Sequence, residues 1–153
     1  MNRIFHASDP DFEEHISSEL ALVEKALLES TRSEYPFVSE TSRHLVVAGG
    51  KRFRPLLVLL AAEFGDPKSP EVIPAAVVVE LTHLATLYHD DVMDEATMRR
   101  GATSANARWD NTVAILTGDF LFARASQILA GLGPDAVRIQ AETFERLCTG
   151  QIK

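Results

Sequence analysis

Residues 71–94 read EVIPAAVVVELTHLATLYHDDVMD, which is the most apolar stretch of the chain and ends in a cluster of charged residues. In a helix over 71–93, apolar side chains would lie on nearly all sides as far as Leu87, so we predict a central, buried helix. Pro74 fits only in its first turn, because proline breaks the interior of a helix. Acids and bases at the end of such a core helix indicate a function.

Helical periodicity recurs through the rest of the chain, and patterns typical of strands are almost absent. Ser8 or Asp9 can cap the first helix. Gly49 and Gly50 fit the end of the second helix, and Pro55 fits the first position of the third. The expected helices span residues 11–30, 36–48, 55–64, 71–93, 104–110, 112–132 and 134–149, with a loop at 99–103. We therefore predict one all-α domain of about seven helices.

Composition narrows the class of protein. Of the 153 residues 46% are hydrophobic and 24% charged, which is typical of a globular domain. The net charge of −7 argues against a nucleic-acid partner. The single cysteine, Cys148, favours a reducing compartment, so we expect a cytoplasmic protein. The richest apolar run, 55–62, has about eight residues where a membrane span needs about 20, and residues 1–10 lack a signal-peptide pattern. We expect no membrane span.

The acidic cluster has the spacing of a metal site. Asp90 and Asp94 lie one helical turn apart, so their Cβ atoms would be about 5–6 Å apart on one face. Two such carboxylates repel each other unless a cation lies between them, and Mg²⁺ prefers hard oxygen ligands. Asp91 points about 100° away, as a supporting or partner-binding residue. The alternative, a solvated acidic helix end, is disfavoured because acids oppose the macrodipole there.

Basic residues flank this cluster on both sides in the sequence. Arg99 and Arg100 follow it closely, and paired guanidinium groups bind diphosphate oxygens bidentately. The segment 49–55, GGKRFRP, precedes the helix and combines glycines that allow close backbone approach with a following helix N-terminus. It supplies a second cationic group, so the sequence predicts two sites for anions of the diphosphate type.

Taken in order, these motifs resemble those of the trans-isoprenyl (polyprenyl) diphosphate synthases, of the long-chain type. The resemblance rests on GGKRFRP at 49–55, His83, DDVMD at 90–94, RRG at 99–101 and Gly118-Asp119, with a weaker match at Gly150-Gln151. It implies an antiparallel helical bundle of the isoprenoid synthase type around a deep cavity. It also implies a prenyltransferase of isoprenoid biosynthesis, which condenses isopentenyl diphosphate head-to-tail onto an allylic diphosphate and releases pyrophosphate.

The resemblance also implies roles for two groups of residues. The first group binds the allylic diphosphate through Mg²⁺ and carries the catalysis, and it consists of Asp90, Asp91, Asp94 and Arg99. Within it Asp90 and Asp94 hold the metal, Arg99 contacts the diphosphate, and Asp91 supports them. The second group binds isopentenyl diphosphate and consists of Lys51, Arg54, His83 and Arg100.

Two small residues bear on product length. Ala85 and Thr86 precede Asp90 by five and four residues, about 6–7.5 Å deeper along the helix. Family members that stop at short products place aromatic residues there, so the resemblance implies an open tunnel and a long product, of more than four isoprene units. Candidates for a deeper wall are Val77, Val78, Leu81 and Thr82.

One part of the family pattern is missing. A second aspartate-rich motif and a lysine–threonine pair do not occur in residues 1–153. We therefore expect residues 1–153 to be the N-terminal portion of a single synthase domain, truncated at the C-terminus and inactive by itself. Family members form homodimers, and we expect one here, with Phe120, Phe122 and Phe144 as candidates for the interface.

Three other interpretations are open. A metal-dependent phosphohydrolase could use His89 and Asp90 but would need further ligands from His6, His15, His44 or His83. A non-catalytic regulatory subunit of a heteromeric prenyl synthase would explain the missing second motif. A terpene cyclase shares the aspartate-rich motif, but it has no second diphosphate substrate for the 49–55 segment to bind.

Overall fold

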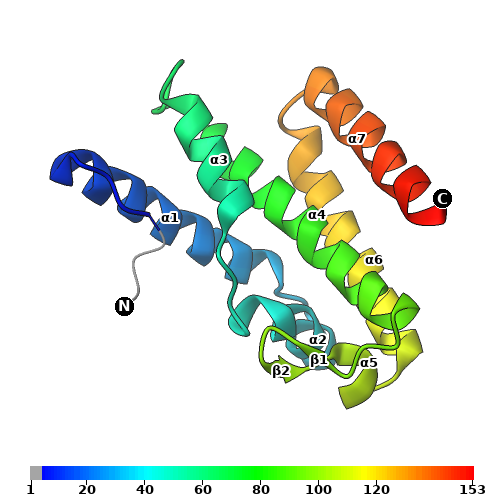
Figure 1. The fold of residues 1–153 in the computed structure, drawn as a ribbon. Coiled ribbons are helices and arrows are strands. Elements are labelled where there is room, and N and C mark those ends of the chain that lie inside the picture. The colour runs from blue at the N-terminus through cyan, green and yellow to red at the C-terminus, as the bar shows by residue number, and fades with distance from the viewer. Residues whose placement is uncertain (1–4) are drawn as a thin grey trace.

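The computed structural model describes residues 5–153 and confirms an all-α architecture (Figure 1). A two-stranded hairpin, β1 (Met98–Arg99) and β2 (Ala102–Thr103), is the only strand pairing among the described residues. The helices are α1 (Pro10–Ser30), α2 (Pro36–Val47), α3 (Phe53–Ala62), α4 (Val72–Met93), α5 (Ala105–Arg108), α6 (Asn111–Ala130) and α7 (Pro134–Ile152).

Helix α4 is the centre of the fold, as its apolar pattern predicts. It packs against α6, α3 and α1, and its Leu81, Leu84 and Tyr88 side chains are fully buried. The Tyr88 hydroxyl donates a hydrogen bond to the Thr41 carbonyl oxygen at 2.5 Å and accepts one from the Leu45 amide at 3.2 Å, which ties α2 to this helix. Burial raises the pKa of Tyr88. The predicted core helix is therefore confirmed.

Helix α1 begins at its predicted cap, whereas α3 and α7 depart from their predicted boundaries. The Asp9 side chain accepts hydrogen bonds from the amides of Asp11 and Phe12 and caps α1. Helix α3 begins at Phe53 rather than at Pro55, because Arg52 takes a left-handed conformation (φ 48°) that turns the chain into the helix earlier. Helix α7 continues to Ile152, beyond the predicted end at residue 149.

The expected loop at residues 99–103 is a tight β-hairpin. Met98 pairs with Thr103 and Arg99 with Ala102. Arg100 and Gly101 form its turn with φ of 53° and 77°, the pair of positive values that a type I′ turn requires. The hairpin thereby fixes the direction in which two consecutive arginines leave the backbone.

Helices α4 and α6 are each long and apolar enough to cross a membrane by length and composition alone. The sequence predicts no membrane span, because no apolar run is uninterrupted for about 20 residues. Polar residues interrupt both helices, but the mean hydropathy of each is still 1.3. Most of the apolar window of α4, 56%, is buried inside the molecule, which is the situation of a core helix.

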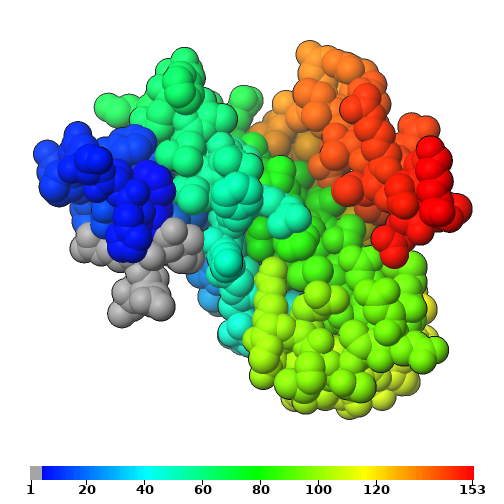
Figure 2. All heavy atoms as spheres, viewed as in Figure 1, coloured from blue at the N-terminus to red at the C-terminus, as the bar shows by residue number. Residues whose placement is uncertain are grey.

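A hollow separates α3 from α7 on the face shown in Figure 2, and α4 lies between them in Figure 1. Helix α6 reaches α4 closely at Gly118, where an added Cβ would lie 2.5 Å from the His89 ring and 3.1 Å from the Ala85 carbonyl oxygen. The α4–α6 contact therefore depends on glycine at this position.

We predict that Gly118→Ala lowers the free energy of unfolding by about 1–3 kcal/mol, because the His89 ring has to move. Gly150→Ala is the matched control, since an added Cβ on α7 meets nothing within 4 Å. The control should leave stability unchanged or raise it by up to ~1 kcal/mol through helix propensity. Urea unfolding followed by circular dichroism measures both, and equal effects would contradict the close α4–α6 contact.

Candidate diphosphate-binding site

A cavity of about 630 Å³ lies among α3, α4, α6 and α7. Along α4 its lining runs from Val79 through Thr86 to Asp90 and Met93. Apolar side chains form much of the rest, namely Leu57, Val58, Phe122, Phe144 and Leu147. The cavity thus joins an apolar interior to the acidic end of α4, which is the shape required by a ligand with a hydrocarbon tail and a charged head.

Asp90 and Asp94 share one face at the end of α4. The Asp94 amide donates to the Asp90 carbonyl oxygen at 2.8 Å, so the helical geometry persists across both residues. Partial burial raises the pKa of Asp90, and the negative charge of Asp94 raises it further. Within residues 5–153 neither carboxylate forms an ion pair with a basic side chain. The two acids repel each other, and a cation between them would relieve that repulsion.

The donor set fits Mg²⁺ shared with a phosphate ligand. In the part of the chain that the structure describes, no group of three or more His, Cys, Asp or Glu side chains is arranged to hold a metal ion. Mg²⁺ is commonly held by one or two carboxylates together with waters and substrate phosphate oxygens. Asp90 and Asp94 suit that mode of binding, and they do not suit a metal held by protein ligands alone.

Asp91 faces the interior, where it holds Arg99. Its carboxylate is fully buried, and its Oδ1 atom accepts from Arg99 Nε at 2.7 Å and lies 2.5 Å from Nη2. This hydrogen bond and the charge of Asp91 raise the pKa of Arg99. The predicted turn of Asp91 away from Asp90 is present, and it aims the guanidinium of Arg99 rather than a metal.

A second cavity, of about 330 Å³, is cationic. It is lined by Gly50, Lys51, Arg52, Phe53, Arg54, Glu80, His83 and Arg100, which include all four residues expected to bind the second diphosphate. Lys51 and Arg54 are exposed, and Arg54 and His83 line both cavities. The two candidate sites are therefore adjacent.

His83 is neutral at neutral pH. Burial lowers its pKa to about 4, helped by the positive charges of Arg54 and Arg100. A neutral imidazole can donate one hydrogen bond and accept another. Several cationic side chains surround His83, and an anionic ligand bound there would offset their positive charge.

Comparison with known proteins decides the family. The family model described as Polyprenyl synthetase matches residues 35–153. The chain belongs to the polyprenyl synthetase family.

Relatives and solved structures of the family agree with this assignment. The chain is 51% identical over 146 residues to a nonaprenyl diphosphate synthase of Mycobacterium tuberculosis, covering 95% of this chain and 44% of the relative. It is 45% identical over 139 residues to heptaprenyl diphosphate synthase component 2 of Geobacillus stearothermophilus, covering 90% and 43%. The crystal structure of a geranylgeranyl pyrophosphate synthase from Corynebacterium glutamicum, complexed with calcium and isoprenyl diphosphate, superposes with a TM-score of 0.84 at 53% identity, covering 97% and 45%. The chain spans less than half the length of these relatives.

The structure separates the two residues that are expected from the sequence to set product length. Thr86 lines the larger cavity, and its hydroxyl donates to the His83 carbonyl oxygen at 2.6 Å. Ala85 does not line the cavity. It is fully buried in the core, with its carbonyl oxygen facing α6, because one residue along a helix turns the side chain by about 100°.

The histidines do not gather around Asp90 as a phosphohydrolase would require. His89 Nε2 lies 3.0 Å from the Ile115 carbonyl oxygen and 3.4 Å from Asp119 Oδ1, so this ring nitrogen faces α6. His15 contacts Glu63 at 2.9 Å, and His44 contacts the Thr103 carbonyl oxygen at 2.7 Å. These three histidines therefore make three different local contacts.

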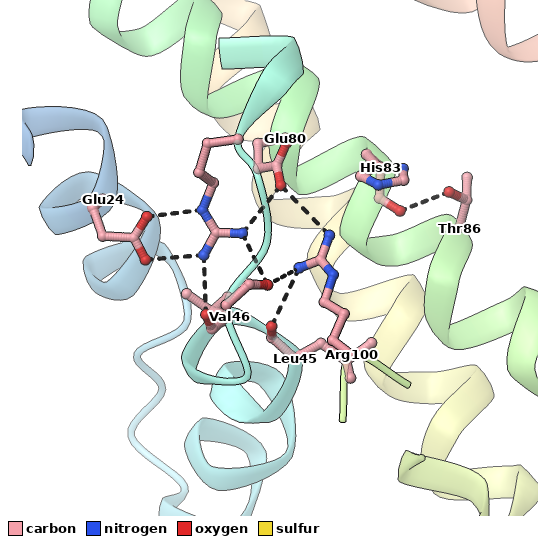
Figure 3. A network of polar contacts seen from close by, with 9 residues as sticks. Glu24, Leu45, Val46, Glu80, His83, Thr86 and Arg100 are labelled. Atoms are coloured by element: carbon pink, nitrogen blue, oxygen red, sulfur yellow. Dashed lines mark hydrogen bonds and ion pairs between the residues drawn. The ribbon is translucent and has the colours of Figure 1, made fainter. Parts of the chain in front are cut away.

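Two buried charged residues, Arg52 and Glu80, were not identified from the sequence. Arg52 Nε and Nη2 donate to Glu24 at 2.8 and 2.9 Å, and Nη1 lies 3.2 Å from Glu80 Oε1 (Figure 3). The signal was present, because Glu80 is a lone carboxylate inside an apolar run and a buried charge requires a partner.

We predict that Asp91→Ala lowers the free energy of unfolding by about 3 kcal/mol, because it leaves the partly buried Arg99 without its counterion. Asp94→Ala removes an exposed carboxylate that repels Asp90, and it should change stability by less than ~0.5 kcal/mol. Urea unfolding of both variants at neutral pH tests the distinction. A larger loss for Asp94→Ala would contradict the assigned roles.

Proposed function

We propose that residues 1–153 supply the diphosphate-binding half of a trans-polyprenyl diphosphate synthase, which condenses isopentenyl diphosphate head-to-tail onto an allylic diphosphate and releases pyrophosphate. The observation that carries the proposal is the adjacency of two unlike anion sites beside one apolar cavity. One site has two carboxylates with Arg99. The other has four basic side chains and a neutral histidine, and its one carboxylate, Glu80, is paired with arginines. Two diphosphates bound differently side by side are what such a condensation requires.

The allylic diphosphate is assigned to the acidic end of α4. Mg²⁺ held by Asp90 and Asp94 would supply positive charge to the diphosphate as it leaves with the bonding electrons. Arg99, aimed by Asp91, binds the same group and stabilises the negative charge that grows on it. Breaking the allylic C–O bond leaves an allyl cation, and the apolar lining excludes water that would react with it.

Isopentenyl diphosphate is assigned to the cationic cavity. Lys51 and Arg54 are exposed and reach its diphosphate from the start of α3, while Arg100 and His83 approach from the hairpin and α4. Arg54 and His83 line both cavities, so a diphosphate held there lies next to the hydrocarbon cavity. Fixing both substrates in this way makes the condensation effectively unimolecular.

The cavity lining supports a long product. Thr86 is small, and Thr82 and Val79 line the cavity about one and two helical turns deeper than Thr86. Aromatic side chains occur in the lining only on α6 and α7, at Phe122 and Phe144. The likeness to a nonaprenyl diphosphate synthase supports this product class. A geranylgeranyl pyrophosphate synthase is about equally similar, so the experiment must distinguish a long product from a shorter one.

A second candidate function comes from the likeness to a protein named component 2 of heptaprenyl diphosphate synthase. Residues 1–153 would then belong to one subunit of a heteromeric enzyme. The specific version to test is a non-catalytic regulatory role for that subunit. The acidic pair Asp90 and Asp94 and the anchored Arg99 favour the catalytic role, since regulation alone gives them no task.

Assembly and location belong to the same proposal. We place the enzyme in the cytoplasm as a homodimer, with exposed apolar residues of α6 and α7 such as Leu116 and Ile139 as interface candidates. Phe122 and Phe144, which the sequence suggested for this face, pack together with ring centroids 4.8 Å apart and line the cavity instead.

The decisive experiment joins residues 1–153 to the C-terminal remainder of the Mycobacterium tuberculosis relative and supplies isopentenyl and farnesyl diphosphates with Mg²⁺. We expect chain elongation by the fusion and almost none by residues 1–153 alone, which contain one aspartate-rich motif. Asp90→Asn should lower the rate on the order of a hundredfold or more, because transition-state charge loses its stabilisation.

Asp66→Asn is the matched control, since Asp66 is exposed in a loop away from both cavities. It should leave the rate unchanged. An Asp90→Asn fusion as active as this control would overturn the catalytic proposal and favour the regulatory one.

We predict that Thr86→Phe in the same fusion shortens the products, because an aromatic ring there blocks the cavity beside α4. Thr97→Phe, in the exposed segment before the hairpin, should leave product length unchanged. Ala85→Phe should instead destabilise the protein, since its side chain has no space in the core. Chromatography of the dephosphorylated products measures the length, and unaltered products from Thr86→Phe would contradict the assigned tunnel.

A further inference from the structure

Glu80 is a buried carboxylate placed between two arginines that come from different parts of the chain. It lies in the middle of α4, and its side chain is 2% exposed. Its Oε1 atom is 3.2 Å from Arg52 Nη1 and 3.9 Å from Arg100 Nη2 (Figure 3). Burying a carboxylate is costly unless it is paired, so this residue has a specific task in the fold or in the site.

Both of these arginines have left-handed backbones. Arg52 has φ 48° and Arg100 has φ 53°, and only Glu95 shares this conformation among the non-glycine residues that the structure describes. The left-handed region is unfavourable for an ordinary residue, so it persists where surrounding contacts impose it. Arg52 and Arg100 share two partners, Glu80 and the Gly49 carbonyl oxygen, and of these only Glu80 is charged.

The Arg100 guanidinium is held in one place by several contacts. Its Nη1 atom donates to the Gly49 carbonyl oxygen in a short hydrogen bond and to the Leu45 carbonyl oxygen at 3.5 Å. Gly50 lies against the guanidinium so closely that an added Cβ would be 2.8 Å from Cζ. Without Glu80, the buried end of this side chain would have only neutral partners.

We infer that Glu80 is a positioning residue, which holds the Arg100 guanidinium and the 49–52 turn in the arrangement that binds the second diphosphate. The inference rests on the proposed function, since it concerns the cationic cavity. Glu80 lines that cavity but carries the charge of its ligand, so direct contact would repel the diphosphate. It acts instead through Arg100 and through Arg52, whose Nη1 and Nη2 also contact the carbonyl oxygens of Gly49 and Val46.

A positioning role and a simple charge effect predict opposite changes in anion affinity for Glu80→Gln. If Glu80 merely lowered the positive potential of the cavity, Glu80→Gln would strengthen binding of an anion. If Glu80 positions Arg100, the same substitution weakens binding, because the guanidinium loses its charged anchor. The loss of one charge-assisted contact corresponds to about a tenfold change in affinity.

The experiment is a calorimetric titration of the protein with inorganic pyrophosphate in EDTA, so that the metal-dependent site does not contribute. We expect Glu80→Gln to bind about tenfold more weakly than the wild type. Glu24→Gln is the matched control, since it removes a carboxylate from Arg52 without contact to Arg100. Its affinity should stay within about twofold of the wild type, as for a partly exposed ion pair.

Two further variants separate positioning from folding. Glu80→Asp keeps the charge but shortens the side chain, so it should also weaken binding, whereas a charge effect predicts no change. In the Arg100→Ala background, Glu80→Gln should have a much smaller effect, because only its contact with Arg52 is then lost. Circular dichroism confirms the helical content of each variant, and Glu80→Asp replaces Glu80→Gln as the deciding measurement if the latter is unfolded.

The outcomes distinguish this inference from the proposed function. A wild-type protein that does not bind pyrophosphate in EDTA overturns the second diphosphate site itself. A wild type that binds, with Glu80→Gln equal or tighter, leaves that site in place and overturns the positioning role. An undiminished effect of Glu80→Gln in the Arg100→Ala background would likewise show that Glu80 does not act through Arg100.

Discussion

The burial of α4 is the constraint on which the rest of the structure depends. Its apolar surface requires cover from α1, α3 and α6, yet the same helix carries Glu80, His83, Asp90 and Asp91, with Asp94 at its C-cap. Each charged group on a core helix must be paired, neutralised or brought to a cavity. All three solutions occur here, and together they place the candidate site along one helix.

Ion pairing with α4 fixes the positions of two consecutive arginines, Arg99 and Arg100. Arg99 is held by Asp91 and Arg100 by Glu80, although these carboxylates lie three helical turns apart on α4. The hairpin turn makes this possible, since the left-handed backbone of Arg100 sends its side chain away from that of Arg99. One buried helix thereby holds neighbouring guanidinium groups in two different directions, and we propose that they bind two different anions.

The local features of the site could be predicted from the sequence, and the long-range ones could not. The i, i+4 spacing fixes Asp90 and Asp94 on one face, and the same geometry turns Asp91 away from them. The hairpin at 98–103 was missed because strands of two residues leave no periodic pattern. Arg52 looked like another surface cation beside Lys51 and Arg54, since nothing nearby in the sequence reveals its contacts with Glu24 and Glu80.

We propose that this chain holds two diphosphate sites, of which only one requires a metal. The most direct measurement is the stoichiometry of pyrophosphate binding to the wild-type protein by calorimetry, first in EDTA and then with saturating Mg²⁺. We expect one equivalent of pyrophosphate per chain without metal and a second equivalent when Mg²⁺ is present. A stoichiometry that does not change with Mg²⁺, or no binding under either condition, would contradict it.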